Sequence, residues 1–183
     1  YWASIAASTA ALLTSFVFFY FLIRDLKNHR DLIKPWFLAG LFFAVISSVG
    51  VFGLSYMMSS GNMTQNLYLS ATYYYLHFQY NGFFIFSCIG FLLLSLKEIG
   101  AEISEKENKM IFWLMFVSCI IGFGLSVLWM KMPLWIFIAI ILATVAQTVG
   151  SVKLYLLIKR NWAKLVLNFS PLQRFVLMYV GFA

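Results

Sequence analysis

The sequence contains few charged residues for its length. Of its 183 residues, 10% are Asp, Glu, Lys or Arg and 63% are hydrophobic, whereas a soluble domain carries about 25% charged residues. This shortage of charge excludes a water-soluble globular domain. It also argues against nucleic acid as a partner, although 13 basic residues outnumber 6 acidic ones, because basic residues that bind nucleic acid gather on a soluble face.

Cysteine and intramembrane acidic residues are also scarce. Cys88 and Cys119 stand in apolar runs without C-x-x-C spacing. They cannot form a metal site alone and are interpreted as small buried hydrophobic residues. No Asp or Glu falls inside an apolar run, so a carboxylate-based proton pump or a cation-coupled transporter is not supported.

Long apolar runs account for most of the chain. Each complete run has about 20 residues or more, which is enough to cross a hydrocarbon core of about 30 Å. We predict an all-α polytopic transmembrane helix bundle, a single domain over residues 1–183 that is a fragment of a larger bundle. Pro35, Pro133 and Pro171 are each expected at the first position of a helix. The predicted spans are 2–23, 36–58, 67–96, 110–130, 134–158 and the start of a sixth, 172–183.

The distribution of positive charge predicts the orientation of the spans, because Lys and Arg are retained in cytoplasmic connectors. The connectors 24–35, 97–109 and 159–170 together hold ten Lys and Arg, whereas the alternate connectors hold only Lys131. We therefore expect these three connectors in the cytoplasm. The net charge of +7 follows mostly from this topology, with bound membrane lipids and their anionic headgroups as partners.

Two spans carry small residues at every fourth position, a pattern that lets neighbouring helices approach closely. We expect both stripes to pack helix against helix. The stripes are Ala3, Ala7, Ala11 and Ser15 in the first span and Ser118, Gly122 and Ser126 in the fourth.

The third span is unusually polar and contains the one ionisable group predicted deep in the membrane, His77. At helical spacing its polar side chains form two faces. We expect protein on both sides, because an unpaired polar group in lipid costs several kcal/mol. The candidate partners are Gln147 of the fifth span and Ser47, Ser48 and Ser55 of the second. One face carries Tyr73, His77, Tyr80, Asn81, Phe84 and Cys88, and the other carries Thr72, Tyr75, Gln79, Gly82 and Phe86.

Two interpretations of His77 stay open from the residues alone. A neutral imidazole in an aromatic pocket can be an axial haem ligand or a copper ligand, with its other ring nitrogen held by a group such as Tyr80 or Asn81. Alternatively, His77 is a hydrogen-bonded core residue that fixes helix packing. His29 stands in a predicted connector, too far away to complete a site.

The run Asn66-Leu67-Tyr68-Leu69, followed by Tyr74-Tyr75-Leu76-His77-Phe78-Gln79-Tyr80-Asn81-Gly82-Phe83-Phe84, resembles a family of bacterial polytopic membrane proteins with an H-F-Q-Y-N-G motif. The resemblance covers nearly the whole chain and implies that the protein lies in a bacterial inner membrane. The family in turn distantly resembles the catalytic subunit of haem-copper oxidases and nitric oxide reductases. In the reductases a histidine that binds copper or iron stands in the pattern H-x-x-x-E-G, and His77, Asn81 and Gly82 match its spacing.

The sequence departs from the reductase pattern in two places. Asn81 replaces the Glu, and the fourth span, 110–130, holds no histidine where the reductases have an adjacent pair. The resemblance therefore implies a bound haem or copper with His77 as one ligand and the other ligands outside this chain. The pocket is expected to contain Tyr73, Gln79, Tyr80, Asn81 and Gln147.

We expect redox chemistry or ligand sensing at this cofactor, and the residues leave enzymatic activity open. The alternative is a non-catalytic membrane subunit or a transporter of a small apolar molecule. In either case the protein is expected to assemble with other membrane subunits or as a homo-oligomer.

Overall fold

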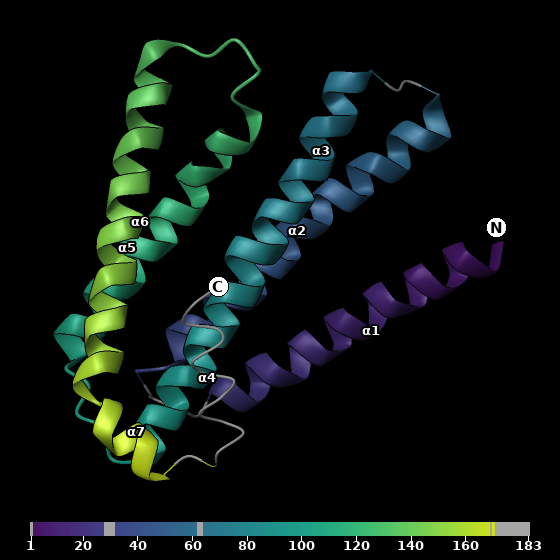
Figure 1. Cartoon of the computed structure of the whole chain (residues 1–183). Coiled ribbons are helices and arrows are strands. Elements are labelled where there is room, and N and C mark those ends of the chain that lie inside the picture. The colour runs from purple at the N-terminus through teal and green to yellow at the C-terminus, as the bar shows by residue number, and fades with distance from the viewer. Residues whose placement is uncertain (1, 28–31, 62–63, 169, 171–183) are drawn as a thin grey trace.

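The computed structural model describes residues 2–27, 32–61, 64–168 and 170. Within these ranges the regular structure is entirely helical, and five helical segments are long and apolar enough to cross a membrane. This confirms the predicted all-α bundle and identifies an integral membrane protein. The predicted sixth span and Pro171 lie outside the described residues. The elements are α1 (Trp2–Lys27), α2 (Lys34–Ser60), α3 (Gln65–His77), the π-helix η1 (Phe78–Phe84), α4 (Ile85–Glu98), α5 (Glu105–Gly122), the 3-10 helix η2 (Phe123–Val127), α6 (Leu134–Arg160) and α7 (Trp162–Asn168) (Figure 1).

Some helix limits differ from the prediction. Pro133 precedes α6 as its N-cap in an extended conformation, and Pro35 is the second residue of α2; both positions tolerate a missing N–H. The fourth span begins earlier than predicted, at Glu105, because Glu105 and Glu107 stand in its first turn, where acidic side chains interact favourably with the helix dipole. The short helix α7 in the connector 159–170 was not predicted.

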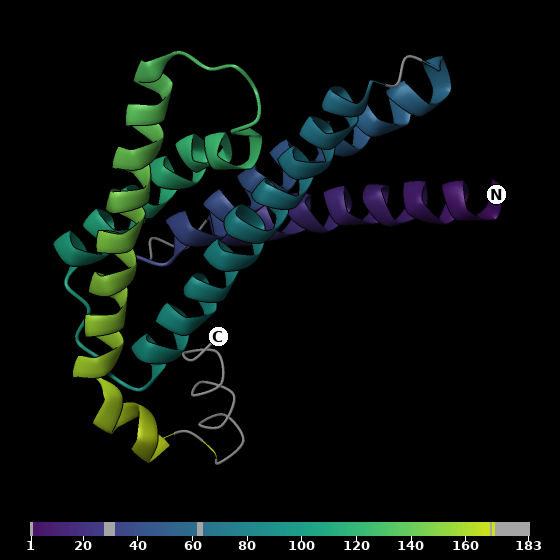
Figure 2. The ribbon, with the colours of Figure 1, turned by 45° about the horizontal axis from the view of Figure 1, so that its top comes forward.

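The helices form two antiparallel pairs. α2 packs against the third span, which consists of α3, η1 and α4, and α5 packs against α6. Figures 1 and 2 show the pairs converging at one end and diverging at the other. We call the converging end, with Lys34, Lys97 and Lys159, the basic end, and the diverging end, with Gly61 and Met130, the open end.

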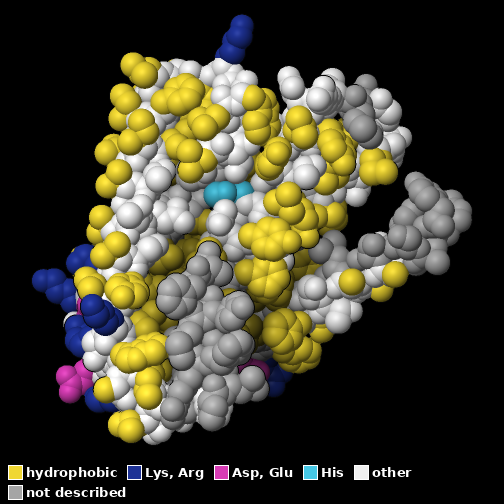
Figure 3. Space-filling view, viewed as in Figure 1, with side chains coloured by type: hydrophobic (Ala, Val, Ile, Leu, Met, Phe, Trp, Pro, Cys, Tyr) yellow, Lys and Arg dark blue, Asp and Glu magenta, His cyan; other side chains and the backbone are white. Residues whose placement is uncertain are grey.

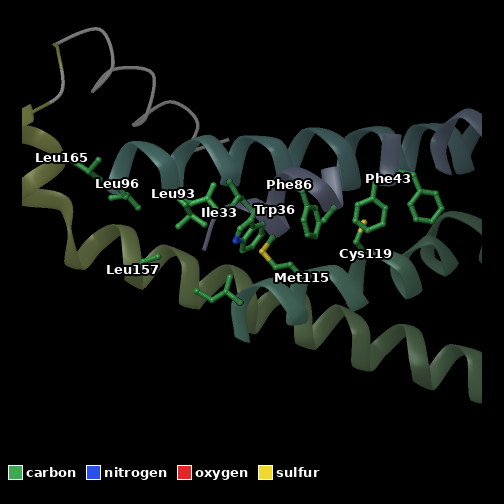
Figure 4. Close-up of a cluster of buried hydrophobic side chains, with 14 residues drawn as sticks. Ile33, Trp36, Phe43, Phe86, Leu93, Leu96, Met115, Cys119, Leu157 and Leu165 are labelled. Carbon is green, nitrogen blue, oxygen red and sulfur yellow. The ribbon is translucent and has the colours of Figure 1, made fainter. Parts of the chain in front are cut away.

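The main hydrophobic core lies towards the basic end. Trp36 is fully buried, and its ring centroid lies 5.5 Å from that of Phe86 and 5.3 Å from that of Phe112. The indole N–H of Trp36 donates to Oδ1 of buried Asn108 at 2.9 Å, and the Asn108 amide donates to the carbonyl of Leu32 at 2.8 Å. These bonds join the start of α5 to the start of α2. Other core side chains in Figure 4 are Ile33, Phe43, Leu93, Leu96, Met115, Cys119, Leu157 and Leu165.

The two small-residue stripes have different outcomes. Ser118 and Gly122 of α5 are buried, as expected, whereas Ser126, which lies in η2, is half-buried. In α1, however, Ala7, Ala11 and Ser15 are exposed, so the expected packing of this stripe is not found among the described residues. α1 leaves the bundle towards its N-terminal end (Figure 2) and meets the third span near its other end, where the rings of Phe19 and Phe83 lie 6.3 Å apart.

Candidate functional site around His77

The third span changes its helical geometry directly after His77. In η1 the N–H of Ile85 reaches the carbonyl of Tyr80, five residues earlier. Gly82 allows this segment to approach α2 closely, because a Cβ at Gly82 would stand 2.5 Å from the Cβ of Phe43. π-helical turns inside α-helices are frequent at functional sites, and η1 contains Asn81, the neighbour of the His77 ring.

The face of the third span opposite His77 is covered by α2. Oγ of Ser47 lies 2.9 Å from Oε1 of Gln79, so one of the predicted serine partners does meet the polar span. All three serines lie within donating distance of a carbonyl of their own helix, and for Ser48 and Ser55 this is the side-chain bond that the structure shows. α2 and α3 also approach each other closely at Gly50, where a Cβ would stand 2.9 Å from the Cβ of Tyr75. Gln79 therefore supports helix packing on this face and lies away from the His77 ring.

Both ring nitrogens of His77 have hydrogen-bond partners. Nε2 lies 2.8 Å from the backbone carbonyl oxygen of Cys119, and Nδ1 lies 3.2 Å from Nδ2 of Asn81. A carbonyl oxygen only accepts, so Nε2 of the neutral ring carries the proton and Nδ1 accepts from the Asn81 amide. Figure 3 shows the histidine side chain (cyan) reaching the surface between the two helix pairs. The lone pair of Nδ1 points at the amide of Asn81, whose side chain is exposed.

The end of α5 explains why the Cys119 carbonyl is available. In a continuous α-helix the N–H of Phe123 would donate to Cys119, four residues earlier. Here α5 gives way to η2, and that N–H donates to the carbonyl of Ile121 instead. The imidazole N–H of His77 donates to the Cys119 carbonyl in place of the Phe123 N–H, and this bond joins the third span to the fourth. Cys119 contributes through its backbone; its side chain is buried as predicted, whereas Cys88, also predicted buried, is exposed.

Two phenylalanines form the aromatic surroundings of the imidazole. The rings of Phe78 and Phe123 meet the His77 ring edge-on, with centroids at 5.1 and 5.9 Å. Neither residue was among the predicted pocket residues. Phe78 stands next to His77 in the sequence and could have been suspected from that position. Phe123 is placed by the change from α5 to η2, for which the sequence offers no clear signal.

The other predicted pocket residues lie around the site in different ways. The ring of Tyr73 packs on Trp129, with centroids 5.2 Å apart. Tyr80 is 59% exposed and stacks on Phe84. Gln147 belongs to α6, which packs on α5, and it does not bind the His77 ring, whose nitrogens both have other partners. Asn81 is the one predicted pocket residue that hydrogen bonds to the imidazole.

A cavity of about 880 Å³ opens next to this site at the open end. It lies between α2, α3 and the start of η2, and small residues such as Gly50, Gly53 and Ala71 form part of its wall. Tyr74 and Phe123 line it as well, and their rings lie 5.2 Å apart. Since Phe123 also contacts His77, the cavity and the histidine share a wall.

Comparison with known proteins matched no protein-family model, no curated protein and no solved structure. The resemblance to haem-copper oxidases and nitric oxide reductases therefore stays a prediction, as do the cofactor and its ligands.

Proposed function

We propose that this integral membrane protein binds a metal ion through Nδ1 of His77, for redox chemistry or ligand sensing. The observation that carries the proposal is the hydrogen bond between Nε2 of His77 and the carbonyl of Cys119. Histidines that bind metals usually donate their other ring N–H to a carbonyl or a carboxylate, which fixes the tautomer and the ring orientation. His77 has this arrangement, with Nδ1 as the nitrogen left for a metal.

The position of Nδ1 favours copper over haem. Nδ1 is bonded to the ring carbon that carries Cβ, so a small ion approaches it more easily than a large macrocycle does. A haem at Nε2 would require the bond to Cys119 to break. Imidazole nitrogen suits copper, zinc and iron. Copper and iron both undergo one-electron chemistry, and copper is the ion that the resemblance implies beside haem. A copper ion held by Nδ1 would take the place of the Asn81 amide, which is hydrogen bonded to this nitrogen in the structure.

The described residues supply one ligand. In these parts of the chain no group of three or more His, Cys, Asp or Glu side chains could hold a metal. The remaining ligands in this proposal come from beyond the described residues, from another protein, or from small molecules.

The test is to load the purified full chain with copper and to measure the bound metal and its electron paramagnetic resonance spectrum. We expect His77→Ala to lose the bound copper. Cys119→Ser is the matched control, because it leaves the carbonyl in place and should retain copper. Equal copper binding and an unchanged spectrum in His77→Ala would falsify the proposal. A Soret band that depends on His77 would instead identify haem as the cofactor.

A second candidate function is the binding or transport of a small apolar molecule, and the cavity of about 880 Å³ favours it. Ligand pockets commonly measure about 300–1,000 Å³ and are mostly apolar. Gly53 offers a way to fill the cavity, because a Cβ there meets only the Cβ of Ala71, at 3.8 Å. We expect Gly53→Leu to abolish binding of an apolar fluorescent probe and Thr148→Leu, on the exposed side of α6, to retain it. Unchanged probe binding in Gly53→Leu would contradict this function.

We also propose that the basic end faces the cytoplasm of a bacterial cell. The charge difference between the connectors supports this orientation. A cysteine introduced at Lys131, in a Cys88→Ser and Cys119→Ser background, should react with a membrane-impermeant maleimide in intact cells, whereas one introduced at Lys106 should react only after lysis. The reverse pattern would contradict the orientation.

A further inference from the structure

The third span has a stripe of side chains that no described residue covers. The stripe runs through η1 into α4, on the face away from α2. Tyr80 and Phe84 are 59% and 46% exposed, and Asn81 and Cys88 are exposed as well. Most of this stripe is apolar, and it carries no charge.

Asn81 makes this stripe unsuitable for contact with lipid. It stands near the middle of the apolar segment Gln65–Glu98 and therefore near the middle of the hydrocarbon core. Among the described residues its side chain makes one hydrogen bond, to Nδ1 of His77. The amide oxygen and the second amide hydrogen stay exposed, and acyl chains cannot bond to them. The stripe therefore requires a partner with a donor and an acceptor at the same depth.

A second copy of this chain meets that requirement. An amide both donates and accepts, so it is complementary to itself across a twofold axis, where a surface meets its own copy. If the axis passes beside Asn81, each oxygen accepts the free N–H of the opposite amide, while the other N–H keeps its bond to His77. Every polar group of the amide then has a partner. The apolar, uncharged side chains around Asn81 likewise suit an identical face.

We propose that the stripe formed by Tyr80, Asn81, Phe84 and Cys88 is the interface of a twofold-symmetric homodimer, with the Asn81 side chains hydrogen bonded to each other. Polar side chains that bond across helices stabilise helix association in membranes. The dimer and the metal site meet at Asn81, because a copper ion at Nδ1 of His77 would displace the Asn81 N–H that the dimer leaves bonded to this nitrogen. The dimer is therefore proposed for, and measured on, the metal-free protein.

The first experiment measures dimerisation of the full chain in lipid vesicles by energy transfer between donor- and acceptor-labelled tags, over a range of protein-to-lipid ratios. We expect Asn81→Leu, which is similar in size and cannot hydrogen bond, to weaken dimerisation about tenfold. Ile141→Ala is the matched control, since Ile141 is 61% exposed on α6 and should leave the dimer unchanged.

The second experiment uses the native cysteines. Cys88 stands two helical turns from Asn81 on the stripe, so copper phenanthroline with oxygen should oxidise two Cys88 thiols to an intermolecular disulfide. The product should persist in Cys119→Ser, disappear in Cys88→Ser, and fall sharply in Asn81→Leu. A chain that stays monomeric at every ratio, or a dimer that Asn81→Leu does not weaken, would overturn the proposal. Either result would mean that the stripe is covered by something other than a second copy.

Discussion

The two ends of the bundle differ in how tightly their side chains pack and in how regular their helices are. At the basic end, large side chains such as Trp36, Phe86 and Leu96 are at most 1% exposed, and the polar Asn108 among them bonds with both its oxygen and its amide nitrogen. Towards the open end the helix pairs diverge, two segments leave α-helical geometry, and Asn81 is exposed. Dense packing stabilises the basic end, whereas the part towards the open end contains the cavity and the exposed amide of Asn81. Stability and candidate function are thus separated along the bundle.

The largest predicted effect tests whether the basic end carries the stability. Trp36→Ala removes a fully buried ring, for which large-to-small core changes cost about 3–5 kcal/mol. It also leaves Oδ1 of Asn108 without its donor, at a cost of about 1–3 kcal/mol. We expect a loss of at least about 3 kcal/mol in the free energy of unfolding, measured by denaturant titration in detergent micelles.

Trp135→Ala serves as the control for this change. Trp135 is 69% exposed near the open end, so its removal should alter the free energy of unfolding by no more than about 0.5 kcal/mol. Equal losses in the two variants would remove the distinction between a packed end and an open one.

A second prediction concerns the close approach that positions η1. Gly82→Ala places a Cβ 2.5 Å from the Cβ and Cγ of buried Phe43, and such overpacking costs about 1–3 kcal/mol. Gly53→Ala is the matched control, because its Cβ makes one ordinary contact at 3.8 Å. The same unfolding measurement should therefore separate the two variants by at least about 1 kcal/mol. If Gly82→Ala is as stable as Gly53→Ala, the contact with Phe43 does not hold η1 in place.

The sequence pattern predicts the fold well and the site incompletely. Apolar run length determines where a helix can cross a membrane. The structure has a helix of sufficient length and apolarity at each of the five predicted complete spans. Helical spacing places His77 and Gln79 on different faces, and Gln79 indeed meets Ser47 of α2, but the prediction that Gln79 belongs to the His77 pocket is not matched by any contact with the imidazole. The π-helix was not predicted, because it accompanies a contact between Gly82 and Phe43, which are far apart in the sequence. The bond from His77 to Cys119 depends on a backbone carbonyl, and every residue type carries one.

Exposure was also predicted incompletely, for a related reason. Periodicity shows which residues share a face, but not whether another helix covers it. Cys88 and the stripe containing Ala7 and Ala11 follow patterns typical of packed helices, yet they are exposed in the structure. A membrane span is apolar on its lipid side as well as its packed side, so composition does not distinguish the two.

The smallest predicted effect concerns the ion pair at the basic end. A guanidinium nitrogen of Arg160 lies 2.9 Å from a carboxylate oxygen of Glu107 and joins α6 to α5, with the two side chains 53% and 24% exposed. Exposed pairs stabilise by about 0–1 kcal/mol, and salt weakens them. We expect Arg160→Ala to lower the free energy of unfolding by less than about 1 kcal/mol, and a double-mutant cycle with Glu107→Gln to show a coupling that falls when salt is added. A loss as large as that of Trp36→Ala would mean that electrostatics, not packing, holds the basic end together.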